Sequence, residues 1–151
     1  MGTPEILLST LLGAVVSAFI PLVNAELIIL SAVTLGPSQL AAPCVLLVTA
    51  GQMMGKAVIF MAGKGAIRIP WLVSAEKIRK ASLRMDENGG TGSLILFASA
   101  SAGLPPFYLT SLACGMLRMS FPRFAVVGFA GRLIRFSAIA LFPQLAQGVL
   151  P

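Results

Sequence analysis

Four ionisable side chains stand within segments that are otherwise apolar. They are Glu26, Lys56, Arg132 and Arg135. Each such charge costs about 2.5–3.5 kcal/mol at the centre of a membrane helix on insertion scales, and normally faces a protein interior or a polar cavity. Three cations against one carboxylate leave an excess of positive charge, and a guanidinium binds phosphate through two oxygens at once. The residue types therefore predict a site for an anionic phosphate group.

Each of these charges also has a structural interpretation. Lys56 either assists the site or extends its long side chain to the headgroup region. Glu26 is either a proton carrier or one half of a salt bridge to Arg135. Arg132 and Arg135 are three residues apart and share one helical face, and one carboxylate does not neutralise both. For this arginine pair we therefore favour a functional role.

The composition excludes several classes of protein. Of the 151 residues 57% are hydrophobic and 11% are charged, against about 25% charged in soluble domains. Histidine is absent and there are two cysteines, so His-based triads and His-ligated zinc sites are excluded. A metal-dependent phosphotransferase would need a carboxylate cluster that the apolar segments lack. We expect an integral membrane protein that is no enzyme and needs no metal or cofactor.

Two segments are long and apolar enough to cross a membrane, and two more are apolar but interrupted. The first class comprises residues 38–62 and 124–147. The interrupted segments are residues 6–35, broken at Pro21, Asn24 and Glu26, and residues 93–117, broken at Gly103, Pro105 and Pro106. Each half of an interrupted segment has about 10–15 residues, whereas a span needs about 20. The breaks predict two hairpin tips.

Two topologies are compatible with this layout. Either all four segments cross, two of them kinked, or the interrupted segments are re-entrant hairpins that return to the side they entered. The re-entrant topology places Arg118 and Arg123 on the same side as the basic residues 64–84, as the positive-inside rule prefers. We favour it, with residues 64–87 cytoplasmic. Because re-entrant backbone must be enclosed by protein or line a water-filled cavity, it predicts a polar cavity between the tips.

The two halves of the chain share one plan. We expect an all-α integral membrane fold of one domain, residues 1–151, built from two inverted repeats: residues 6–63 and 93–147, each a re-entrant hairpin followed by a transmembrane helix. Residues 64–92 would join them, with an amphipathic helix over 71–85 on the inner leaflet. The sequence GK-x-x-x-F at residues 55–60 parallels GR-x-x-x-F at residues 131–136. Inverted repeats of broken helices are typical of secondary transporters.

Polar residues near the two tips complete the predicted site. Asn24 would line the first tip beside Glu26. Tyr108 and Thr110 follow the second tip, where their hydroxyls would bind a headgroup or make ordinary hydrogen bonds between helices. The small-residue pattern GxxxG at residues 51–55 favours close helix packing, within the protomer or in a homodimer.

A series of motifs runs along the chain: FIPLVNAE at residues 19–26, the glycine pattern of residues 51–64 with Phe60, LPP at 104–106, ACGMLRM at 113–119, Phe124, and GRLIRF at 131–136. In this order and spacing they resemble the DedA family of membrane proteins, also called the VTT or SNARE-associated family, in its small YqaA-like branch. The resemblance covers roughly residues 15–145. It implies opposed re-entrant hairpins and the movement of undecaprenyl phosphate or phospholipid between leaflets. The chain departs from larger bacterial members at Lys56, where they tend to be acidic, and at residues 97–101, where they carry an arginine.

The expected function is therefore a lipid translocase, of flippase or scramblase type, in a bacterial inner membrane, whose partner is the anionic headgroup of a lipid. The alternatives are a secondary transporter of a small soluble anion and a non-transporting scaffold whose basic loop recruits a partner. Nucleic acid is not an expected partner, because no known nucleic-acid-binding signature accompanies the basic segment 64–87 and apolar runs flank it on both sides.

Overall fold

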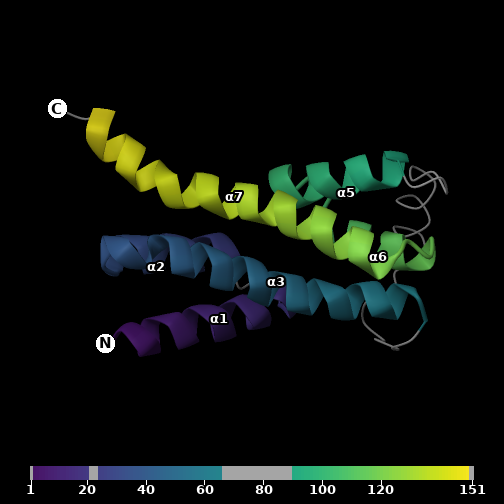
Figure 1. The fold of residues 1–151 in the computed structure, drawn as a ribbon, viewed down its shortest axis with the longest axis horizontal. Helices are drawn as coiled ribbons and strands as arrows, with labels where there is room; N and C mark the ends of the chain where they lie inside the picture. The colour runs from purple at the N-terminus through teal and green to yellow at the C-terminus, as the bar shows by residue number, and fades with distance from the viewer. Residues whose placement is uncertain (1, 21–23, 66–89, 150–151) are drawn as a thin grey trace. The chain divides into compact units, whose positions relative to one another are not determined.

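The computed structural model describes residues 2–20, 24–65 and 90–149, and in these residues all regular secondary structure is helical (Figure 1). This confirms the all-α prediction for those residues. Pro21 and the predicted amphipathic helix 71–85 lie outside them. The helices are α1 Thr3–Phe19, α2 Ala25–Leu35, η1 Ser38–Leu40 (a 3-10 turn), α3 Ala41–Gly63, α5 Gly90–Ala102, α6 Phe107–Met116 and α7 Phe121–Val149.

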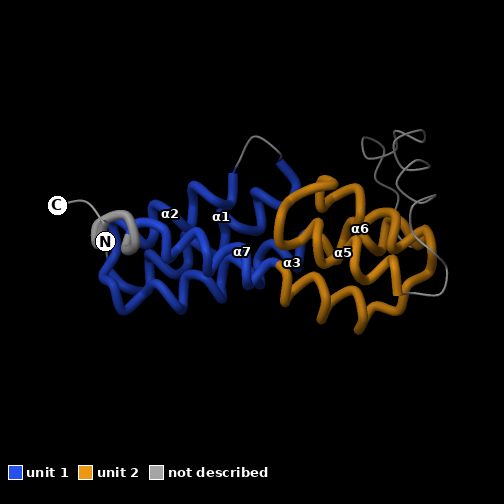
Figure 2. Tube along the Cα trace, turned by 90° about the horizontal axis from the view of Figure 1, so that it is seen from above, with its two compact units in different colours: residues 1–55, 132–151 blue, residues 56–131 orange. Residues whose placement is uncertain are grey.

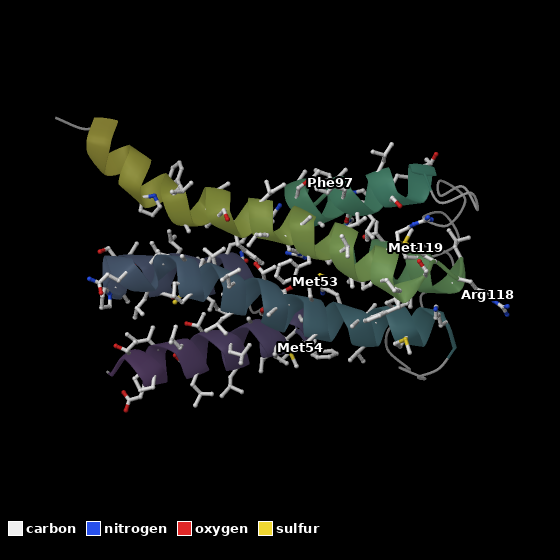
Figure 3. All side chains as sticks on the ribbon, in the orientation of Figure 1. Met53, Met54, Phe97, Arg118 and Met119 are labelled. Carbon is white, nitrogen blue, oxygen red and sulfur yellow. The ribbon has the colours of Figure 1, made fainter. Side chains whose placement is uncertain are left out.

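Two of these helices are long and apolar enough to cross a membrane. They are α3 with its preceding turn, Ser38–Gly63, and the part of α7 over Phe121–Pro143. Both predicted spans are thus confirmed as long apolar helices. Helix α7 begins three residues earlier than predicted, with Pro122 in its first turn, where the missing N–H of proline costs no helical hydrogen bond. The adjacent Met53 and Met54 of α3 are respectively buried and exposed, so α3 has one covered and one open side (Figure 3).

The first interrupted segment forms a pair of packed short helices. Helix α1 has 17 residues and α2 has 11, and they pack against each other. One groove of about 540 Å³ is lined by Ile6 and Thr10 from the first turns of α1, by Leu35 at the end of α2 and by Gly36, which directly follows α2. The chain therefore returns to the end of the hairpin at which it entered. The break falls between Phe19 and Ala25, at the predicted tip.

The second interrupted segment forms a similar pair. Helices α5 and α6 have 13 and 10 residues and pack against each other. Gly103, with φ +84°, ends α5, the Leu104–Pro105 peptide is cis, and Pro106 directly precedes α6. Glycine adopts this left-handed conformation without the steric cost of a Cβ. The break predicted at residues 103–106 is confirmed as the end of one helix and the start of the next.

The chain divides into two compact units (Figure 2). Unit 1 comprises residues 1–55 and 132–151, and unit 2 comprises residues 56–131. Each unit contains one hairpin and parts of both α3 and α7. The core of unit 1 includes Ile29, Val48 and Phe136, whereas in unit 2 the rings of Phe60 and Phe124 stack with centroids 4.4 Å apart.

Both units use one kind of glycine contact to seat a long helix on a hairpin. In unit 1, a Cβ added to Gly51 of α3 would lie 2.9 Å from Ala14 Cβ and 3.1 Å from the Leu11 carbonyl oxygen, both on α1. In unit 2, a Cβ on Gly131 of α7 would lie 2.6 Å from Ala100 Cβ and 3.1 Å from the Phe97 carbonyl oxygen, both on α5. Gly51 and Gly131 thus make equivalent packing contacts in the two units. The sequence pattern instead aligns Gly131 with Gly55, which lies one helical turn after Gly51.

Candidate functional site: an ion pair and a groove in unit 1

Asn24 and Glu26 stand at the start of α2, directly after the break in the first hairpin. Asn24 caps this helix, and its Oδ1 accepts a hydrogen bond from the backbone N–H of Glu26 over 2.9 Å. A helix begins with unpaired N–H groups and a partial positive charge, which a capping side chain and an acidic residue in the first turn both complement. The predicted tip residue Asn24 thus sets where α2 begins and where the Glu26 side chain starts.

Glu26 is paired with Arg135 of α7, and both residues belong to unit 1. The Arg135 Nε donates to Glu26 Oε1 over 2.9 Å, and the Nη2 of the same guanidinium also contacts this oxygen. The Arg135 side chain is 22% exposed and that of Glu26 is 36% exposed. The predicted salt bridge between these two residues is therefore present, and it remains accessible to water or to a ligand.

Arg132 lies one turn before Arg135 on α7 and is half-buried. Its guanidinium carbon sits 5.7 Å from the centroid of the Phe136 ring, within the range of a cation–π contact. It also interacts electrostatically with both Arg135 and Glu26. These three groups, two guanidinium groups and one carboxylate, carry a net charge of +1 at neutral pH. The arrangement suits a singly charged anion.

The remaining predicted cation, Lys56, belongs to unit 2. It lies on α3 directly after Gly55 and its side chain is only 6% exposed. Burial of a lysine requires compensation for its lost hydration, usually through an ion pair or hydrogen bonds. The structure thus encloses Lys56 in protein.

The predicted residues of the second tip lie in unit 2, and their hydroxyls differ in exposure. Tyr108 is 36% exposed, whereas Thr110 is buried. The Thr110 hydroxyl is 2.9 Å from that of Ser99 on α5 and donates to the Phe107 carbonyl oxygen over 3.0 Å. Thr110 is thus used in the contact between α5 and α6, the structural alternative considered for it.

Arg118 and Arg123, which guided the expected topology, are both exposed. The Arg118 side chain projects away from the helices at the turn between α6 and α7 (Figure 3). Its φ is +56°, a left-handed conformation that is common at helix ends but infrequent for residues with a Cβ. Both arginines are therefore available to lipid headgroups or water.

A groove adjoins the Glu26–Arg135 pair, and the sequence analysis did not predict it. It has a volume of about 380 Å³ and is lined by Asn24, Glu26, Leu27, Leu30, Ala138, Ile139 and Phe142. The α7 residues of the groove follow Arg135 at spacings of three, four and seven residues, so they lie on the same helical face as Arg135. The sequence spacing alone could therefore have identified this wall of the groove. The partner helix was not identifiable from that spacing.

Sequence reasoning also missed the hydrogen bonds of two buried polar residues, Gln52 and Ser99. The Gln52 side-chain amide on α3 donates to the Ala14 carbonyl oxygen over 3.2 Å and to the Ser17 hydroxyl. Ser99 donates to the Pro105 carbonyl oxygen at the second tip. A polar side chain within an apolar span is the signal that would have identified Gln52.

Among the described residues, no group of three or more His, Cys, Asp or Glu side chains lies close enough together to hold a metal ion. Comparisons with protein families, with curated proteins and with solved structures find no match to this chain. The functional assignment therefore depends on the arrangement of the residues themselves.

Proposed function

We propose that this chain is a lipid translocase of the DedA type that moves an anionic lipid between the leaflets of a bacterial inner membrane. The observation that carries the proposal is the cluster of Arg132, Arg135 and Glu26 on and beside α7, a helix apolar enough to cross the bilayer. Two guanidinium groups at about the middle of such a helix are costly in lipid unless a partner or a ligand offsets them. A lipid phosphate would add one negative charge to a cluster of two guanidinium groups and one carboxylate.

The fold supports this role because each of its short helices is too short to cross the bilayer by itself. Helices of 10–17 residues reach about 15–26 Å at 1.5 Å per residue, less than the roughly 30 Å hydrocarbon core. In our proposal both hairpins are re-entrant, residues 64–87 are cytoplasmic, and both termini lie outside. Asn24 and the Glu26–Arg135 pair then stand at the tip of the first hairpin, within the membrane.

In this mechanism the phosphate of the lipid exchanges with the Glu26 carboxylate on Arg135, while Arg132 holds a second phosphate oxygen. The guanidinium fork presents parallel N–H donors to two oxygens of a phosphate. Glu26 restores its pair with Arg135 when the lipid departs, so the charge on Arg135 stays compensated throughout the cycle.

The test is lipid flipping by the purified full-length chain in liposomes. We expect Arg132→Ala with Arg135→Ala to abolish flipping of phosphatidylglycerol bearing a fluorescent group, because the double variant removes both phosphate ligands. Arg132→Lys with Arg135→Lys retains the charge but loses the two-pronged geometry, and we expect partial flipping. The control is Arg123→Ala, which removes an exposed cation from the same helix.

Three outcomes would count against the proposal. Unchanged flipping in the double alanine variant would remove the arginines from the mechanism. Uptake of inorganic phosphate without lipid flipping would favour a soluble-anion transporter. Absence of any flux in the wild-type protein, together with binding of a partner through residues 64–87, would favour a scaffold.

A further inference from the structure

The groove beside the ion pair is built from one face of each of two helices in unit 1. On α7 this face contains Arg135, Ala138, Ile139 and Phe142, at spacings of three, four and seven residues. Such residues fall on the same side of a helix over two turns. From Arg135 to Phe142 the face extends about 10 Å, at 1.5 Å per residue. The groove is thus elongated along α7.

Helix α2 forms the opposite wall. Glu26 stands at its start, and Leu27 and Leu30 follow within the next turn. Because Glu26 is bonded to Arg135, the polar ends of the two walls coincide. The groove therefore has a charged end at the ion pair and a hydrocarbon wall of leucine, alanine, isoleucine and phenylalanine beyond it.

The apolar wall is open rather than filled by the protein's own side chains. Leu27 is 64% exposed and Phe142 is 69% exposed, although both line the groove. Its volume of about 380 Å³ lies within the range of about 300–1,000 Å³ that is usual for small-molecule sites. A charged end and an open apolar wall match the two parts of a lipid.

We infer that this groove binds one hydrocarbon chain of the transported lipid while the phosphate of the same molecule is held at Arg135. The inference rests on the proposed function and extends it. The translocase then recognises both the headgroup and the first part of the chain, and Ala138, Ile139 and Phe142 are binding residues for the chain.

The charge pattern selects this occupant over a second copy of the protein. The cluster at the polar end has two arginines and one carboxylate, and a lipid phosphodiester brings the one negative charge that neutralises it. A second copy would bring apolar side chains to the wall, but the one acidic residue of its α2 and α7, its own Glu26, is already bonded to its own Arg135. In the bilayer the bound chain leaves other lipid chains rather than water, so van der Waals contacts with the groove wall stabilise it.

The test uses two photoreactive lipids in phosphatidylcholine liposomes that contain the full-length protein. One is phosphatidylglycerol with a diazirine in its acyl chain, and the other is diacylglycerol with the same chain and no phosphate. Labelled positions are mapped by mass spectrometry. Phe142 is compared with Val126, which lies on the same helix, is also 69% exposed and does not line the groove.

We expect the ratio of labelling at Phe142 to labelling at Val126 to be higher for phosphatidylglycerol than for diacylglycerol. The variant Ala138→Phe fills the groove and lowers that ratio about tenfold, the change expected if about 1.4 kcal/mol of binding is lost. The control Leu141→Phe adds bulk at an exposed position of α7 outside the groove, and should leave the ratio unchanged.

Equal ratios for the two lipids would overturn the inference, because the groove would then be ordinary lipid-facing surface. An efficient disulfide between two copies carrying Phe142→Cys, with loss of lipid labelling, would overturn it in favour of a dimer contact. If selective labelling persists but the wild-type protein does not flip lipid, the proposed function fails while the binding groove stands. If flipping occurs and labelling is unselective, the groove fails and the function stands.

Discussion

At the scale of single residues, the pair Glu26–Arg135 is the contact that the candidate site depends on. Its two partners are 109 residues apart in the chain and meet through two N–H contacts to one carboxylate oxygen. If one partner is removed, the other remains as an unpaired charge in an apolar segment, and this costs more free energy than the intact pair contributes. Removal of either side chain should therefore destabilise the protein. The pair therefore makes a measurable contribution to the stability of unit 1.

The first prediction is a coupling between the two residues. Glu26→Gln and Arg135→Gln should each destabilise the protein, and the double variant should lose less than the sum of the two. We expect a coupling of about 1–3 kcal/mol, below that of a fully buried pair because both side chains are partly exposed. Thermal unfolding in detergent measures it, with Arg123→Gln as the control. Strict additivity of the two single changes would show that the pair contributes no stability.

The second prediction concerns the cap of α2. Asn24→Ala removes the acceptor for the Glu26 N–H and should cost about 1 kcal/mol, the usual value for an N-cap. Because Glu26 is in the first turn of α2, fraying there should also weaken its bond to Arg135. Hydrogen exchange at the first turn of α2 measures the change. Asn24→Asp keeps an acceptor and should retain protection, and equal loss of protection in both variants would exclude the capping role.

At the scale of elements, glycine decides how closely each long helix approaches its hairpin. Gly51 of α3 and Gly131 of α7 face alanines of α1 and α5, respectively, and neither position has room for a Cβ without movement of its neighbour. Helices in membranes associate through such small residues because lipid offers little hydrophobic driving force between them. The same device seats a long helix in both units.

The third prediction follows from this packing. Gly51→Leu and Gly131→Leu should each destabilise the protein by about 1–3 kcal/mol or more, the usual cost of overpacking. The matched control is Gly90→Leu, since an added Cβ there meets nothing within 4 Å. Leucine favours a helix over glycine, so the control should be neutral or stabilising. Thermal unfolding in detergent compares the three. A loss at Gly90 equal to that at Gly51 would mean that close packing is not the cause.

At the scale of the whole molecule, the alternation of short and long helices is what permits a re-entrant topology. The first turns of α1 and the end of α2 line one groove, so the two ends of the first hairpin lie together. In the topology that we propose, both ends therefore lie on one side of the membrane. Four consecutive crossings would instead place them on opposite sides.

The fourth prediction tests that topology in cells. Single cysteines are introduced into a protein that carries Cys44→Ala and Cys114→Ala, at Thr3, Gln39, Lys64 and Ser120. In the re-entrant topology a membrane-impermeant maleimide labels the first two positions from outside and the last two only after permeabilisation. Labelling of Thr3 and Gln39 from opposite sides would exclude a re-entrant first hairpin. The same result for Lys64 and Ser120 would exclude it for the second.

The sequence alone predicted the helical class, the two long apolar helices and the positions of both breaks. These follow from local properties: runs of apolar residues favour helices, and the proline, glycine and asparagine at residues 21–24 and 103–106 interrupt them. The sequence also identified the charged candidate residues, because a charge within an apolar segment can be recognised without knowledge of the fold.

The sequence did not determine the contacts between segments that are distant in the chain. It allowed two interpretations of Glu26, a proton carrier or a partner of Arg135, and the tertiary structure shows the pair. The groove between α2 and α7 was not predicted. The GK-x-x-x-F pattern aligned Gly55 with Gly131, whereas the packing matches Gly51 with Gly131. Helices that are apolar on most sides carry a weak periodic signal, so their sequences leave rotation and register open. Close packing of specific side chains, available only in the folded chain, selects one register.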